Sequence, residues 1–211
     1  MMLPMKKVFA LILTSLTPLH ALAFEPDVVA MADISTVEKY LNRLESFQAD
    51  FEQFVPGAPF SEGVFYLKRP GKFLWQYLKP TPHKLISDGG LIYYEDGETN
   101  QVTQVPRGGF ADVFGKNHLR LLGGDIQVID HMRDEDSIAI TIELEATDAE
   151  DFQSSNRLQF MFSREPLQLK QMVTSNQLGQ DIVVTFGNIK ENTPIKDSVF
   201  AYIPPHYEDD F

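Results

Sequence analysis

The sequence lacks cysteine, is poor in basic residues and has no long apolar run after its N-terminus. Without cysteine the chain has no disulfide, thiolate zinc site, iron–sulfur cluster or cysteine nucleophile. Its 18 Lys and Arg face 30 Asp and Glu, and this net charge of −12 argues against nucleic-acid partners, whose phosphates bind basic side chains. No later segment approaches about 18 consecutive apolar residues. We therefore predict one soluble domain with a substantial core.

Motifs for catalysis or cofactor binding are also missing. No phosphate-binding glycine loop, dinucleotide fingerprint or Gly-x-Ser-x-Gly elbow occurs. Acidic residues at 95–96 and 134–136 could supply an acid/base pair, but both groups coincide with turn signals, where charge is expected. The later histidines lack the i, i+4 spacing of a helical metal site: His83, His118, His131 and His206. We predict a protein that is not an enzyme and needs no metal or cofactor.

The first 23 residues are typical of a secretory signal peptide. Lys6 and Lys7 precede an apolar run at 8–16, which is too short to span a bilayer and so argues against an N-terminal anchor. An Ala-x-Ala cleavage site ends at Ala23. Cleavage would leave residues 24–211, a single domain of 188 residues with a charge of −14, since the leader carries two Lys and no acid. Phe24, not cysteine, would follow the cut, so we predict an unlipidated protein of the periplasm or exterior.

Hydrophobic periodicity predicts two helical segments among many short strands. A capping box at 35–38 is expected to start a helix whose apolar stripe includes Val37, Tyr40, Leu41 and Leu44, with residues 24–34 as a frayed lead-in. A second helical pattern covers residues 110–122, and an acidic stretch at 148–151 is expected to be a hairpin loop. Alternating patterns predict ten or eleven strands, the last at residues 198–203.

Phenylalanine is the abundant aromatic residue, with 16 copies against 8 Tyr and Trp together. A sheet with a Phe-rich face needs a cover, and two short amphipathic helices would not fill a large interior. The space between sheet and helices would then be an apolar pocket suited to acyl chains. The pattern leaves open the alternative of a fully packed α+β core without a cavity.

Several segments resemble the LolA family of periplasmic outer-membrane lipoprotein carriers. The most specific is the Arg-Pro-x-x-Phe-x-Trp element, which runs from Arg69 to Trp75. The match covers about residues 35–207, with its motifs in family order. These are 47–53 (FQADFEQ), 63–75 (GVFYLKRPGKFLW), 85–89 (LISDG) and 200–205 (FAYIPP). The sequence departs from the family at the start of the second helical region, 107–122, which lacks the usual Thr-Pro.

The resemblance implies a mainly β, α+β fold: an incomplete, strongly curved antiparallel β-barrel with a helical lid over a hydrophobic cavity. It also implies a monomeric carrier that accepts acylated lipoproteins from an inner-membrane ABC transporter and hands them to an outer-membrane receptor. A competing hypothesis is a periplasmic regulatory or adhesion module that uses the same half-barrel without lipid cargo.

The resemblance further suggests the residues that would perform this role. Arg69 lies in register with Phe65 and Leu67, so its guanidinium would need acceptors such as lid carbonyls, and the matching arginine of the family holds the lid closed and favours retention of bound lipoprotein. The alternative is a solvated arginine on a tight turn. The cavity wall would comprise Phe47, Phe51, Phe65, Leu67, Phe73 and Trp75, and the apolar face of the lid Leu41, Leu44, Val113, Phe114 and Leu119. Ordinary core packing is the alternative for both groups.

Overall fold

A computed structural model describes most of the chain after its first 23 residues. The predicted signal peptide, the acidic stretch 148–151 and the end of the 200–205 segment lie outside the described residues. The described ranges are 24–107, 109–124, 126–144, 157–175 and 180–202. No helix within these ranges has both the length and the apolar character that crossing a membrane requires.

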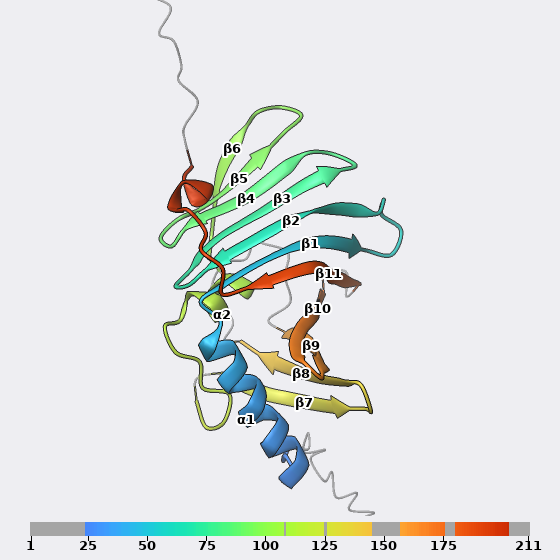
Figure 1. The fold of residues 1–211 in the computed structure, drawn as a ribbon. Helices are drawn as coiled ribbons and strands as arrows, with labels where there is room; N and C mark the ends of the chain where they lie inside the picture. The colour runs from blue at the N-terminus through green and yellow to red at the C-terminus, as the bar shows by residue number, and fades with distance from the viewer. Residues whose placement is uncertain (1–23, 108, 125, 145–156, 176–179, 203–211) are drawn as a thin grey trace, which may run out of the picture.

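One antiparallel sheet of eleven strands dominates the fold (Figure 1). Its order is β6-β5-β4-β3-β2-β1-β11-β10-β9-β8-β7, and β6 and β7 form its two edges without pairing to each other. The predicted incomplete barrel of ten or eleven strands is therefore confirmed. The strands are β1 (Ser46–Phe54), β2 (Ser61–Lys68), β3 (Lys72–Lys79), β4 (His83–Asp88), β5 (Ile92–Asp96), β6 (Val102–Val105), β7 (Gln127–Arg133), β8 (Ser137–Glu143), β9 (Arg157–Arg164), β10 (Leu167–Ser175) and β11 (Asp181–Glu191).

The strand order determines where the connections must run. The chain proceeds strand by strand from β1 in the middle of the sheet to the edge at β6, then from the opposite edge at β7 back to β11, which pairs with β1. The connection between the two edges, residues 106–126, contains the short helix α2 (Phe110–Gly115). Because this segment joins opposite edges of a curved sheet, it covers the inner face.

The first helix begins earlier than the sequence pattern predicts. Helix α1 spans Val28–Arg43, and its N-cap is Asp27, whose side chain accepts a hydrogen bond from the Ala30 amide at 2.8 Å. Ser35 therefore lies inside the helix, and the predicted capping box and frayed lead-in are wrong. The carboxylate of Glu38 instead accepts the Leu121 amide at 2.6 Å, so its hydrogen bond is tertiary rather than a cap.

Two further predictions of secondary structure are wrong. Helix α2 ends at Gly115 and does not reach residue 122, because the polar backbone groups that follow bond to other parts of the protein, as described below. Of the predicted strand at 198–203, residues 198–202 are described, and they do not form a strand. A 3-10 helix, η1 (Asp197–Phe200), packs Phe200 against Leu74 and Ile86 on the outer face. Strand β11 pairs with β1 on one side and with β10 on the other, so the segment that follows β11 cannot pair with it as a further strand.

The strands bury one face, as the alternating pattern predicts. On β1, Phe47, Ala49 and Phe51 are buried, whereas Asp50 and Glu52 are exposed. Gly63 on β2 makes room for this face, because a Cβ there would lie 2.7 Å from the Phe51 ring and 2.0 Å from the Gln76 carbonyl. The main core thus lies between the inner face of the sheet and the helices.

A buried acid fixes α1 to the edge of the sheet. Asp33 is 6% exposed; its carboxylate accepts a hydrogen bond from Arg133 of β7 at 2.7 Å and lies 3.0 Å from Nε2 of His131. Farther along the helix, the Tyr40 hydroxyl donates to Glu191 at 2.6 Å and accepts the Leu169 amide at 3.1 Å. Burial, reinforced by Glu191, raises the pKa of Tyr40 well above its usual value. These contacts join α1 to three strands, β7, β10 and β11.

Replacing Asp33 with alanine should lower the free energy of unfolding by about 1–3 kcal/mol, because Arg133 would lose its acceptor and the half-buried His131 its polar neighbour. Urea denaturation would measure the change. Lys79→Ala is the control, since its ion pair with Glu62 is exposed and should contribute little. Equal stabilities of wild type and Asp33→Ala would contradict the assigned role.

Candidate functional site

The predicted cavity-wall residues lie together on the inner face of β1, β2 and β3. Cross-strand pairing places Phe47 opposite Leu67, Leu67 opposite Phe73, and Phe65 opposite Trp75. All are buried: Trp75 is 8% exposed and the other five 1%. Their rings contact one another, with Phe65 and Trp75 centred 4.5 Å apart and Phe51 and Trp75 5.3 Å apart. The structure therefore assembles one aromatic layer from these residues, which we call the aromatic wall.

Phe110, at the start of α2, packs on this wall. Its ring centre lies 5.3 Å from that of Phe65, 5.8 Å from that of Phe73 and 5.6 Å from that of Trp75, edge-to-face in each case. Phe110 is not among the residues predicted for the cavity wall or the lid, although it begins the helical pattern at 110–122. In this conformation, side chains of the covering segment occupy the apolar interior.

The predicted lid residues are also brought together, although two lie outside the helices. Leu41 in α1 and both Val113 and Phe114 in α2 are buried, as are Leu44, just after α1, and Leu119, beyond the end of α2. Phe114 packs against Phe110 at 4.5 Å and against Phe160 of β9 at 6.0 Å. The apolar face of the lid thus touches both halves of the sheet.

Side chains of α1 hold the segment that follows α2. Asn42 donates to the Leu119 carbonyl at 2.9 Å and accepts the Leu119 amide at 2.8 Å. Glu38 accepts the Leu121 amide one turn away along α1. These bonds replace the helical ones that residues 116–122 would otherwise make. We call α2 and residues 116–122 the lid.

Arg69 joins the lid to the sheet. It follows β2 in the turn before β3, and its guanidinium donates to the Leu41 carbonyl of α1 at 2.6 Å and to the Lys116 carbonyl of the lid. Burial lowers the pKa of Arg69, but an arginine remains charged at neutral pH. Its own amide donates to the Glu45 carbonyl at 2.9 Å, which fixes the turn. Both acceptors of the guanidinium are backbone carbonyls, and the Arg69 side chain is half-buried.

A second arginine, which the sequence analysis did not select, fixes the other side of the lid. Arg107 donates to the carbonyl of Gly89 at 3.0 Å, in the turn between β4 and β5, and lies 3.8 Å from the Asp112 carboxylate in α2. The turn between β2 and β3 also contacts α2. In this turn the amide of Gly71, a residue at φ 70°, donates to the Phe114 carbonyl at 3.1 Å. Because arginine is common at surfaces, the sequence offered no signal that would have identified Arg107.

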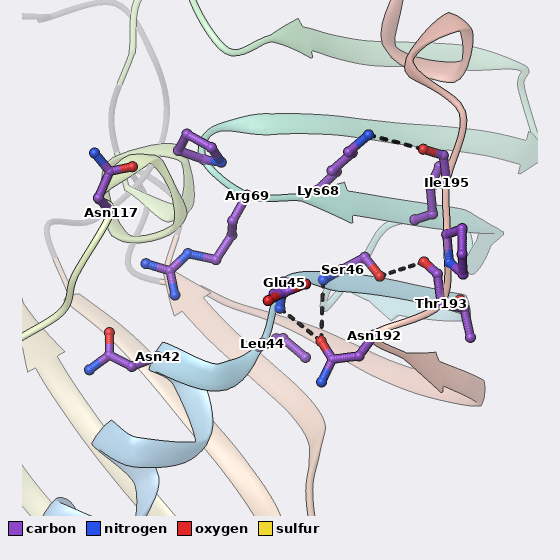
Figure 2. Close-up of a pocket in the computed structure, with 12 residues that line it drawn as sticks. Asn42, Leu44, Glu45, Ser46, Lys68, Arg69, Asn117, Asn192, Thr193 and Ile195 are labelled. Atoms are coloured by element: carbon purple, nitrogen blue, oxygen red, sulfur yellow. Dashed lines mark hydrogen bonds between the residues drawn. The ribbon is translucent and has the colours of Figure 1, made fainter.

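A pocket of about 450 Å³ with a mixed polar and apolar lining opens beside Arg69 (Figure 2). Figure 2 shows the guanidinium extending between Asn117 of the lid and Asn42 of α1, with Lys68 at the end of β2. Asn192 supports the junction of α1 and β1 by accepting the Glu45 amide at 2.8 Å. The pocket gives water access to Arg69, and its amide and charged side chains distinguish it from the aromatic wall.

Polarity returns at the opposite end of the aromatic wall. The hydroxyl of Tyr77, the inner residue after Trp75 on β3, donates to Gln53 at 2.7 Å, and the His83 ring stacks on Tyr77 at 4.3 Å. Burial raises the pKa of Tyr77 and lowers that of His83. Among the described residues, no three His, Asp or Glu side chains gather in a way that could hold a metal ion.

Comparisons with known proteins identify relatives over most of the chain. Residues 42–203 match the family model described as "Outer membrane lipoprotein carrier protein LolA". An outer-membrane lipoprotein carrier protein of Methylococcus capsulatus is 28% identical over 81% of this chain and 83% of its own length. That of Nitrosomonas europaea is 26% identical over 85% and 89%, respectively.

A solved structure shares the fold. An uncharacterized conserved protein from Thermus thermophilus superposes with a TM-score of 0.50 at 12% identity, covering 83% of this chain and 94% of that protein. At this identity the likeness concerns the fold alone.

Replacing Arg69 with leucine should release the lid locally. The amides of Leu119 and Leu121 should then exchange with solvent about tenfold faster or more, because two charge-assisted hydrogen bonds are lost. Amide hydrogen exchange followed by NMR or mass spectrometry would measure this. Arg157→Leu is the control, since Arg157 pairs with Glu143 on β8, and it should leave lid exchange unchanged. Identical lid exchange in Arg69→Leu and wild type would show that the Arg69 hydrogen bonds do not hold the lid.

Proposed function

The family model covers 162 of the 211 residues, so the chain belongs to the LolA family, and from this premise we propose that it carries lipoproteins through the periplasm. In this role the protein binds the acyl chains of lipoproteins released by an inner-membrane ABC transporter and delivers them to an outer-membrane receptor. The observation that carries the proposal is the aromatic wall under a lid that polar side chains of α1 and Arg69 hold in place.

The energetics of such a carrier follow from apolar burial. Each methylene group exposed to water costs about 0.8 kcal/mol, so an acylated protein cannot cross an aqueous space unescorted. Moving the chains from a bilayer into an aromatic interior exchanges one apolar environment for another. The net free energy of transfer is then small, and modest differences in lid position can decide between loading and release.

Arg69 supplies a difference of this kind. Since Phe110 packs on the aromatic wall, acyl chains must displace it, and the bonds of Arg69 to Leu41 and Lys116 stabilise the unloaded, closed state. A hydrogen bond to a charged group contributes about 1.5–3 kcal/mol. Two such bonds oppose loading and favour release, so we assign Arg69 to the unloaded state rather than to retention of cargo.

The charge of the chain suits a shuttle between membranes. After removal of the predicted leader its net charge is −14, and low positive charge limits unproductive adsorption to anionic lipid. The proposed cycle consists of binding and release by a monomer, and its steps require no bond chemistry and no cofactor.

Protein isolated from the periplasm of its own cells should include complexes with lipoproteins, because bound acyl chains would otherwise be exposed to water. Native mass spectrometry would show added masses equal to intact acylated proteins. A regulatory or adhesion module would instead carry unacylated partner proteins. Finding only such partners, or none, would favour the competing hypothesis.

Arg69→Leu should accept lipoproteins from spheroplasts but transfer them poorly to outer membranes, because the closed state that favours release is weakened. A release-and-transfer assay with labelled lipoprotein would measure both steps. Arg157→Leu should behave as wild type in both. Undiminished delivery by Arg69→Leu would show that these hydrogen bonds do not control transfer.

A further inference from the structure

The aromatic wall contains one polar atom without a partner. Nε1 of Trp75 is buried and donates no hydrogen bond to any atom of the structure, and it is the one buried side-chain polar atom in that state among the described residues. Leaving a buried donor unpaired costs free energy, and native structures seldom retain one without a reason. Phenylalanine fills the equivalent inner positions nearby, at Phe65 and Phe73, without this cost.

The surroundings of Trp75 restrict what could accept this proton. Its indole ring lies among Phe51, Phe65, Phe110 and Phe186. A resident water would need two to four polar partners, and the aromatic cluster offers one. A carboxylate or phosphate would be buried there without a counter-charge. The acceptor that fits is neutral, and it must arrive together with apolar material.

We infer that Trp75 Nε1 donates a hydrogen bond to the carbonyl oxygen at the head of a bound acyl chain. This inference rests on the proposed function and adds that the site reads the ester or amide linkage as well as the hydrocarbon. Every acyl chain, unlike an alkyl chain, carries such a carbonyl. The bond can form once Phe110, which packs on Trp75 in the closed state, moves away with the lid.

The position of Trp75 on β3 also orients the chain. Phe73 precedes it on the inner face, and Tyr77, bonded to Gln53, follows. The hydrocarbon therefore lies toward Phe73 and the polar head toward Tyr77. Trp75 marks the boundary between the apolar and polar sections of the wall.

The single tryptophan makes this inference directly measurable, because the protein has one indole N–H resonance. Two probes suffice: a short-chain diacyl phosphatidylcholine and its dialkyl ether analogue of equal chain length, which lacks the carbonyls. In wild-type protein labelled with nitrogen-15, the indole proton resonance should lie farther downfield with the ester than with the ether. If the resonance has the same position with both bound lipids, the inference is overturned. It is also overturned if the indole N–H donates permanently to the face of a neighbouring aromatic ring.

Affinities measured by calorimetry provide the second test. Wild type should prefer the ester, and Trp75→Phe should lower the ester-to-ether affinity ratio about fivefold. Phe73→Leu, the matched control on the same strand, should weaken both lipids by the same factor and keep the ratio. A ratio unchanged in Trp75→Phe would overturn the inference while leaving the carrier function intact. Failure of wild type to bind either lipid would overturn both. If Trp75→Phe does not fold, the resonance measurement on the wild-type protein still tests the inference.

Discussion

A curved sheet with an aromatic inner face must keep that face out of water. Phe47, Phe51, Phe65 and Phe73 are each 1% exposed, although the sheet has open edges at β6 and β7 and does not close around them. Burying one such side chain stabilises the fold by about 1.5–3 kcal/mol, so the cover is an energetic requirement. The connection from β6 to β7 supplies part of this cover, because Phe110 and Phe114 of α2 pack on the inner face. Acyl chains would satisfy the same requirement as the lid does, and the proposed carrier exchanges one cover for the other.

The polar contacts divide the cover into a fixed part and a releasable part. Helix α1 is joined to the sheet by Asp33 and Tyr40, whose partners lie on β7, β10 and β11. The lid after α2 is held to α1 by Asn42 and Glu38 and to the sheet by Arg69. Water reaches Arg69 through the adjacent pocket, so its guanidinium can be solvated when these bonds break. The carboxylate of Asp33, by contrast, is buried.

The sequence allowed the sheet and the aromatic wall to be predicted, because both depend on alternation that any strand with one buried face must show. The alternation of Phe47, Ala49 and Phe51 predicts which face of their strand is buried. Because Arg69 is in register with Phe65, its side chain was predicted to lie on the same inner face. The helix ends were mispredicted because local signals compete with distant contacts. Ser35 and Glu38 have the spacing of a capping box, but Asp27 caps the helix and Glu38 binds an amide 83 residues away. Phe110 and Arg107 depend on the crossover between the sheet edges, which no local pattern encodes.

Displacement of the lid by cargo is the central claim, and a distance measurement tests it most directly. The chain has no cysteine, so single cysteines at His118 in the lid and Asp88 at the end of β4, both exposed, can carry spin labels. Double electron–electron resonance would compare the unloaded protein with a purified lipoprotein complex. We expect a single short distance without cargo and a longer, broader distribution with it. An unchanged distribution in a verified complex would show that acyl chains bind without displacing the lid.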